Sequence, residues 1–207
     1  MALITNEATL KSEVAEWLNR SDLTTAIGTF IQVAEAQLRK DSRIRRLVDA
    51  DLVVTQDDMA LPSDLKTLEG LYHDSDLAKG AIEIVNVSQI GDLKVQHGTT
   101  GTPAFAAILD NGSTLRFAPA PEQDFTLKIS YWSNLPDLSA GANWLIQDHP
   151  DIYLYATLLQ SAMFLKDDAR MGQWAQLLSQ SVESLHQTLQ DEQFSGTMSR
   201  QFTPIGG

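Results

Sequence analysis

The stretch that decides the fold is Phe125-Thr126-Leu127-Lys128-Ile129-Ser130-Tyr131, in which apolar and polar side chains alternate. Successive side chains of a strand point to opposite faces of a sheet, so this period of two predicts a half-buried strand. The same period extends over about 47–135. We expect weaker strands over Leu47–Thr55, Thr67–Asp74 and Ala81–Val85. The centre of the chain is therefore predicted to be β-rich.

Within this region, Asp110-Asn111-Gly112 lies between two apolar segments, Ala104–Leu109 and Thr114–Ala118. An Asn-Gly pair suits a primed turn with positive φ, so these segments are predicted to form a β-hairpin. Residues 87–93 have the spacing of a short helical turn.

Outward from the centre, the period changes to that of a helix. Leu10, Val14 and Leu18 predict a helix over about 7–19, with Asn6 as its N-cap. A second apolar stripe predicts a helix over about 23–42, in which Gly28 marks a weak point or the true start.

Two more helices are predicted after the β-rich region. Asp148 is expected to cap the first of them, with Pro150 in its first turn. Lys166-Asp167-Asp168 interrupts the pattern, and a last helix then continues to about Leu189. We therefore predict an α+β chain in which residues 1–46 and 141–191 form a helical bundle. Residues 47–140 are a β-rich insertion and residues 192–207 an extended tail.

The composition excludes several classes of protein. The 207 residues include no cysteine, which excludes a disulfide scaffold, thiolate zinc sites and cysteine nucleophiles. No apolar run approaches the roughly 18–20 residues of a membrane-spanning helix, so no membrane partner is expected. With 27 acidic and 15 basic residues, the net charge is −12, which disfavours general DNA binding. Residues 47–140 alone carry fourteen acids and five bases.

Five of the fifteen bases lie in one short window, which we call the basic window. Arg39, Lys40 and Arg43 complement the C-terminal dipole of a helix, or the whole window contacts an acidic partner surface or a nucleic-acid backbone. Because the rest of the chain is strongly acidic, a protein partner is favoured. The residues are Arg39, Lys40, Arg43, Arg45 and Arg46.

The last helix has a polar face made of Gln and Ser with almost no charge. Such a face is either Gln-rich solvent surface or a subunit contact, since Gln and Ser bury without the desolvation cost of an ion. The candidate contact residues are Gln173, Gln176, Gln180, Ser184 and Gln187. Beyond this helix, spaced apolar residues favour a tail that docks on a partner over a tail free in water. These residues are Phe194, Met198, Phe202 and Ile205.

The search for catalytic and metal-binding patterns is negative. The sequence has no metal-ligand spacing, phosphate loop, dinucleotide-binding fingerprint or nucleophile elbow, so no catalytic residue, metal or cofactor is predicted. The His73-Asp74-Ser75-Asp76 stretch is interpreted as a solvated turn. A first alternative function is a small hydrolase, for which His73 and these nearby acids are the only candidate residues. A second alternative is a carbohydrate- or protein-binding module that uses Tyr72, Tyr131 and Trp132, although core packing is the favoured role for these aromatic residues.

Several short blocks, taken in order, resemble the head-to-tail adaptor (connector) proteins of tailed bacteriophages. The N-terminal blocks are Trp17-Leu18-Asn19-Arg20-Ser21-Asp22-Leu23 and Phe30-Ile31-Gln32-Val33-Ala34-Glu35-Ala36-Gln37-Leu38-Arg39-Lys40-Asp41. Further blocks are Leu61-Pro62-Ser63-Asp64-Leu65, Gly98-Thr99-Thr100-Gly101-Thr102-Pro103, Asn143-Trp144-Leu145 and Pro150-Asp151-Ile152-Tyr153-Leu154-Tyr155-Ala156. Related adaptors often have proline at the position of Gly28, and the tail matches no block.

The resemblance implies a structural protein of the virion neck, assembled in the bacterial host cytoplasm. It implies a homo-oligomeric ring of twelve copies below the portal protein, extending the DNA channel. Downstream tail or nozzle proteins would dock on this ring, and DNA would pass without sequence-specific binding. A ring needs two different complementary faces on each subunit.

Overall fold

The computed structural model describes residues 3–73 and 80–195, without the side chains of residues 111, 168 and 192–195. The chain forms two compact units. The helical unit comprises Met1–Ile44 and Leu135–Gly207, and the sheet unit comprises Arg45–Asn134. Residues 135–140 belong to the helical unit, and not to the predicted insertion, because Leu135 and Leu138 are buried in its core.

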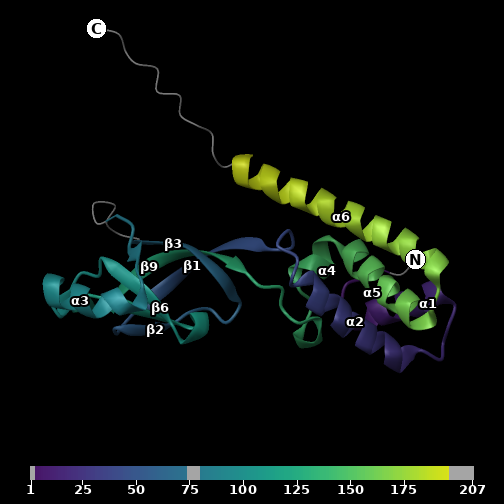
Figure 1. The fold of residues 1–207 in the computed structure, drawn as a ribbon, viewed down its shortest axis with the longest axis horizontal. Helices are drawn as coiled ribbons and strands as arrows, with labels where there is room; N and C mark the ends of the chain where they lie inside the picture. Colours follow the sequence, from purple (N-terminus) through teal and green to yellow (C-terminus); the bar gives the residue numbers. More distant parts are fainter. Residues whose placement is uncertain (1–2, 74–79, 196–207) are drawn as a thin grey trace, which may run out of the picture. The chain divides into compact units, whose positions relative to one another are not determined.

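The helical unit is built around α5 (Pro150–Leu165). This helix contacts α1 (Glu7–Leu18), α2 (Thr24–Leu38), α4 (Trp144–Asp148) and the long α6 (Asp168–Ser195), as Figure 1 shows. A short 3₁₀ turn, η2, spans Leu138–Ala140. Because α5 has neighbours on several sides, it is apolar over most of its circumference. Its fully buried residues include Ile152, Tyr153 and Leu158.

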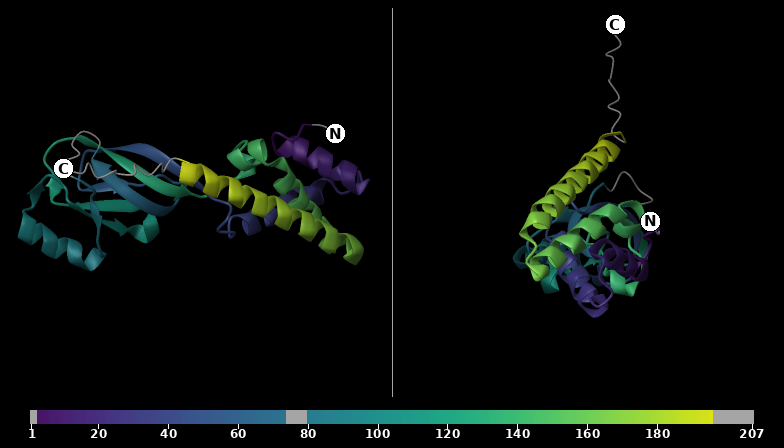
Figure 2. Two further views of the ribbon diagram at one scale, coloured as in Figure 1. Left: turned by 90° about the horizontal axis from the view of Figure 1, so that it is seen from above. Right: turned by 90° about the vertical axis from the view of Figure 1, so that its right-hand side faces the viewer.

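Helix α6 lies against the rest of the helical unit (Figure 2), and aromatic contacts attach it there. The ring of Trp174 lies 5.5 Å from that of Trp17 in α1 and 6.3 Å from that of Tyr155 in α5. Further along α6, Val182 and Leu185 are buried in the core. The inner face of α6 is therefore held along much of its length.

Local side-chain interactions set the ends of the N-terminal helices. Asn6 caps α1 as predicted, and its side chain accepts from the backbone N–H of Thr9. Helix α2 ends at Leu38, before the predicted boundary near residue 42, and Gly28 lies inside it. The carboxylate of Asp41 accepts from the N–H of Arg43, and this turn competes with further helix.

The C-terminal helices differ from prediction at two ends. Asp148 is the last residue of α4 and does not cap α5; Asn143 caps α4, and Pro150 opens α5. Helix α6 continues to Ser195, so the first four residues of the predicted tail are helical. No glycine or proline follows Leu189 until Gly196, and Gln and Glu are good helix formers.

The central strand of the sheet unit is β9 (Phe125–Ser133), which contains the alternating stretch. It pairs antiparallel with β1 (Arg46–Val54) on one side and with β3 (Leu65–His73) on the other. Ile129 is paired with Ala50 and Leu71. Its side chain, like those of Leu127 and Tyr131, is buried, so the predicted half-buried strand is confirmed.

A second sheet has the order β2-β7-β6-β4. Its strands are β2 (Asp58–Ala60), β4 (Glu83–Ile84), β6 (Phe105–Leu109) and β7 (Thr114–Ala118). The short strands β5 (Thr100–Gly101) and β8 (Ala120–Pro121) form a third sheet. Helix α3 spans Val87–His97, longer than the single turn predicted. The α+β class is thus confirmed.

The predicted hairpin is present as β6 and β7, which pair antiparallel. Its connection is a 3₁₀ turn, η1 (Asp110–Gly112), and not a two-residue primed turn. Positive φ falls on Asp110 and Gly112, at 50° and 98°. The sequence signal located the turn but not its type, because aspartate and glycine both tolerate positive φ.

Candidate functional site

Arg39, the first base of the basic window, is engaged within the helical unit. It follows the last turn of α2, and its Nε donates to the carbonyl oxygen of Leu135 at 2.9 Å. Its guanidinium also pairs with the carboxylate of Asp137. Arg39 thereby holds the segment that leads into η2.

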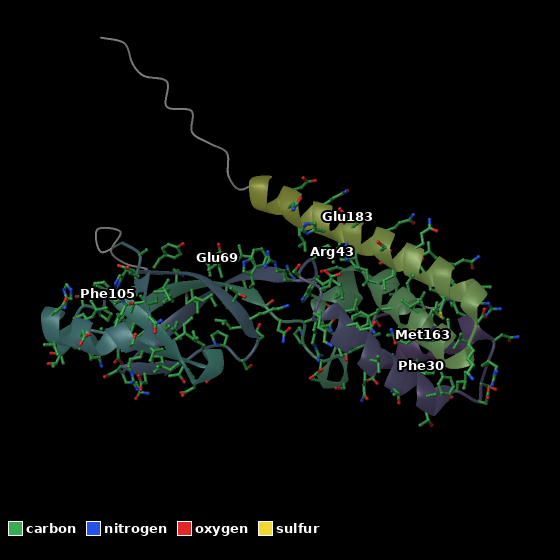
Figure 3. All side chains as sticks on the ribbon, in the orientation of Figure 1. Phe30, Arg43, Glu69, Phe105, Met163 and Glu183 are labelled. Carbon is green, nitrogen blue, oxygen red and sulfur yellow. The ribbon has the colours of Figure 1, made fainter. Side chains whose placement is uncertain are left out.

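Arg43 is also engaged. Its guanidinium donates two hydrogen bonds to the carboxylate of Asp41, and its Nη1 lies 3.4 Å from the carboxylate of Glu183 in α6 (Figure 3). The hydrogen bond from Arg43 lowers the pKa of Asp41. The pair joins the turn after α2 to α6.

The remaining three bases differ in environment. The guanidinium of Arg45 lies 4.1 Å from the ring centroid of Trp132, whose indole N–H donates to Glu69 at 3.0 Å. Lys40 and Arg46 are exposed, and neither forms an ion pair with the part of the chain that the structure describes. The window is therefore not one open cationic patch, and Lys40 and Arg46 are its bases available to a partner.

The uncharged face of α6 is exposed. Val182 and Leu185 anchor the opposite side of the helix, so this face is presented by a rigid element. The exposed residues include all five predicted contact residues: Gln173, Gln176, Gln180, Ser184 and Gln187. Of the predicted docking tail, the side chain of Phe194 and the whole of Met198, Phe202 and Ile205 lie outside the described residues.

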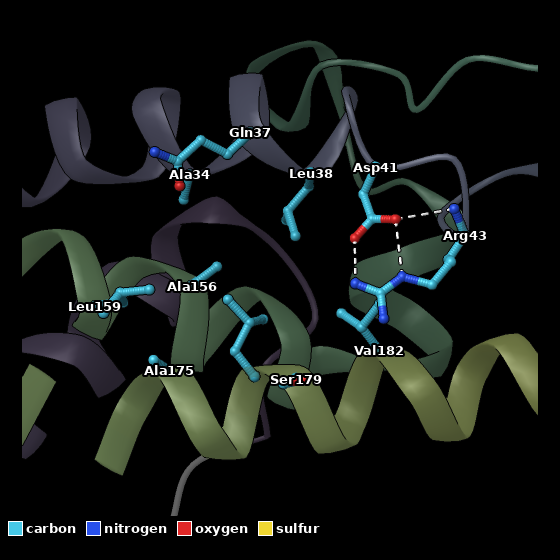
Figure 4. A pocket seen from close by; sticks show the side chains of 11 residues that line it. Ala34, Gln37, Leu38, Asp41, Arg43, Ala156, Leu159, Ala175, Ser179 and Val182 are labelled. Carbon is cyan, nitrogen blue, oxygen red and sulfur yellow. Dashed lines mark hydrogen bonds and ion pairs between the residues drawn. The ribbon is translucent and has the colours of Figure 1, made fainter. Parts of the chain in front are cut away.

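The structure adds a groove that the sequence does not indicate. It lies between α2, α5 and α6 in the helical unit and has a volume of about 210 Å³ (Figure 4). Ala156 and Leu159 of α5 line it together with residues of the flanking helices, and Asp41 and Arg43 lie at one end. The flanking residues are Ala34, Gln37 and Leu38 of α2 and Ala175, Leu178, Ser179 and Val182 of α6.

The groove is small and apolar. Its volume is below the roughly 300–1,000 Å³ of most small-molecule sites, which suits one or two inserted side chains. Further along α5, Met163 and Phe164 are 44% and 60% exposed. The ring of Phe164 lies 5.2 Å from that of Phe30 in α2. Sequence reasoning missed the groove because three separate helices must meet to form it.

The residues behind the two alternative functions are dispersed over the sheet unit, and of them His73 lines a polar pocket of about 320 Å³ with Glu122 and Thr126. His73 is only 8% exposed; its ring stacks on Phe125 at 5.5 Å, and its Nε2 lies 3.1 Å from the carbonyl oxygen of Pro103. It is a packed histidine and not part of a solvated turn, while Asp74 and Asp76 lie outside the described residues. Tyr131 is buried, and the adjacent Trp132 points to the other face of the sheet.

Neither a metal-binding cluster nor a membrane-spanning helix is present among the described residues. Residues 3–73 and 80–195 contain no cluster of three or more His, Asp or Glu side chains placed to hold a metal ion. Over the same residues, no helix has the length and apolar character needed to cross a membrane. The uncharged face of α6, the exposed bases and the groove are described features suited to contacts with other proteins.

A family model described as SU10 adaptor protein matches residues 5–201, which covers both units and most of the tail. A search of curated proteins finds no match.

Proposed function

Because this chain belongs to the SU10 adaptor protein family, we propose that it is a bacteriophage head-to-tail adaptor that forms a ring of twelve copies below the portal. The ring extends the DNA channel of the virion neck and offers a docking surface to tail or nozzle proteins. The observation that carries this proposal is a family match that includes nearly the whole chain. The subunits assemble in the bacterial host cytoplasm.

The outer face of α6 is well suited to a contact between neighbouring subunits. Its 28 residues give a helix about 42 Å long at 1.5 Å per residue. Stable interfaces bury on the order of 1,000 Å² or more, and a helix of this length supplies a large part of such an area. Gln and Ser side chains satisfy one another by hydrogen bonds when water is removed.

The charge distribution suits a conduit for DNA. Residues 47–140 carry fourteen acids and five bases. A negatively charged channel wall repels phosphates and lets DNA slide without binding. In contrast, Lys40 and Arg46 are exposed cations at which an acidic surface of the portal or of a tail protein can dock.

Assembly can be tested on the purified protein with and without its portal. We expect mass photometry and negative-stain images to show closed rings, either of the protein alone or on the portal. A closed ring follows from a contact between two different faces of each subunit. A protein that remained monomeric and bound no portal would contradict the proposal.

The tail supplies a separate test of portal docking. Deletion of residues 196–207 removes Met198, Phe202 and Ile205 but leaves α6 complete to Ser195. We expect an unchanged far-ultraviolet circular dichroism spectrum and weaker binding to the portal. Equal portal affinity of the full-length and shortened proteins would contradict a docking role for the tail.

A further inference from the structure

The groove between α2, α5 and α6 is an apolar surface that the ring contact proposed above does not use. Leu178 and Val182 on α6 and Leu159 on α5 line it, and small side chains such as Ala156 and Ala175 leave room beside them. Contact with water at such a surface is unfavourable, because apolar area is more stable away from water. An apolar segment that filled the groove would therefore be stabilised.

The residues that follow α6 carry apolar side chains at a matching distance. Along α6, Val182 and Leu178 lie about 20 Å and 26 Å before Ser195, at 1.5 Å per residue. If Gly196 and Thr197 form a reversal and the chain then follows a polyproline II path, with three residues per turn and about 3.1 Å per residue, Phe202 and Ile205 face the same side, about 16 Å and about 25 Å back along the helix. Glycine directly after a helix is the residue type most suited to such a reversal.

Charge is also complementary at the near end of the groove. Asp41 and Glu183 flank Arg43 there, which leaves an excess of one negative charge. Arg200 is the one charged residue between Gly196 and Gly207, and it precedes Phe202 by two positions. A tail running back along α6 would bring this cation toward the two carboxylates as Phe202 reaches Val182.

We propose that residues 196–207 fold back along α6 of the same chain and insert Phe202 and Ile205 into the groove between α2, α5 and α6. The tail is tethered to one wall of the groove, so its effective concentration there is in the millimolar range, above that of a tail from another molecule. The apolar residues of the tail are thereby covered in the free protein. A partner that binds the tail must first displace it from the groove.

Disulfide formation between introduced cysteines tests this arrangement in the full chain. The protein has no cysteine, so each pair is unambiguous. In the test variant, Thr203→Cys is combined with Ser179→Cys, which lines the groove. In the control, Thr203→Cys is combined with Ser184→Cys, which is nearer to Ser195 but lies on the uncharged face of α6. Both serines are exposed, so the substitutions leave the core intact.

We expect the test pair to form an intramolecular disulfide at least about tenfold faster than the control pair under mild oxidation. Peptide mapping and non-reducing gels identify the bond. Adding Phe202→Ser and Ile205→Ser should reduce the rate to that of the control, whereas Gln201→Ser should leave it unchanged.

Three results would overturn the inference: equal rates for the two pairs, a disulfide that joins two chains, or a rate insensitive to loss of Phe202 and Ile205. The inference depends only on the helical unit, and its failure is distinguishable from failure of the proposed function. Rings that form without the fast intramolecular bond would refute the folded-back tail alone. A fast bond in a protein that forms no ring would refute the adaptor assembly alone.

Discussion

Glu35 carries a buried carboxylate at the centre of a hydrogen-bond network in the helical unit. Its carboxylate is nearly buried and accepts hydrogen bonds from the N–H of Leu138 at 2.8 Å and from the hydroxyl of Tyr153 at 3.0 Å. Asn143 donates to the same hydroxyl at 2.7 Å. This network joins α2 to α5 and to the segment that returns from the sheet unit, and burial raises the pKa of Tyr153.

Replacing Glu35 tests how much this network stabilises the fold. Glu35→Ala leaves two buried donors unsatisfied, so we expect the free energy of unfolding to fall by about 2–4 kcal/mol. Glu35→Gln keeps one acceptor oxygen and should cost about 1 kcal/mol. Urea denaturation provides the measurement, with Glu16→Ala on the exposed face of α1 as control. Similar losses in Glu35→Ala and Glu16→Ala would exclude the role given to Glu35.

Asp41 provides a prediction for pH dependence. The hydrogen bond from Arg43 lowers the pKa of Asp41 in the folded protein, so its ionised form is favoured by folding. This contribution to stability is present above the unfolded pKa of about 3.9 and is lost as pH falls through the lower folded value. We therefore expect Asp41→Asn to destabilise the protein at pH 7 and to differ less from the wild type as pH approaches 2.

Urea denaturation at several pH values measures this difference. Asp124→Asn, at an exposed position before β9, serves as the matched charge control. If Asp41→Asn were equally destabilising at pH 7 and near pH 2, the ion pair with Arg43 would not account for its effect.

At the scale of elements, the reversal between α5 and α6 depends on one residue in a left-handed conformation. Lys166 has φ 56° and ψ 41° and ends α5. Glycine adopts this conformation without the clash that a Cβ causes, so Lys166→Gly should raise the free energy of unfolding by about 1 kcal/mol. Asn19, which ends α1 with φ 51°, is the matched control.

We expect Asn19→Gly to gain only about 0.3 kcal/mol, because asparagine tolerates the left-handed region better than lysine. Thermal and urea denaturation of both variants give the comparison. A larger gain at Asn19 than at Lys166 would contradict this explanation.

Elements with a complete local signal were predictable from the sequence. The alternation over Phe125–Tyr131 predicted β9, and Asn6 predicted the start of α1. The strand β2 spans only Asp58–Ala60, too short to show a period, and its pairing with β7 bridges more than fifty residues of sequence. The end of α2 was missed because the side chain of Asp41 competes with the helix there.

At the scale of the whole molecule, the uncharged face of α6 makes the proposed ring testable by charge. Gln176→Glu combined with Gln180→Glu places like charges in the subunit contact, where their desolvation is unfavourable. We expect at least about a tenfold loss of ring at equal protein concentration, with the fold of the subunit retained. Mass photometry and circular dichroism measure the two properties.

The control adds the same charge elsewhere. Gln96→Glu combined with Gln123→Glu places two exposed carboxylates in the sheet unit. If both double variants impaired the ring equally, general repulsion would explain the loss. If neither did, the uncharged face of α6 would not be a subunit contact.

The sequence by itself determined the α+β class, most helices and strands and the membership of an adaptor family, because periodicity, capping residues and ordered blocks are local properties of the chain. The tertiary structure decided which bases of the basic window remain available to a partner protein. Arg39 and Arg43 are engaged by Asp137 and Glu183, which lie about one hundred residues or more away. The groove is likewise a property of the tertiary structure alone. Its walls come from three helices, which pack together only when the apolar core of the helical unit forms.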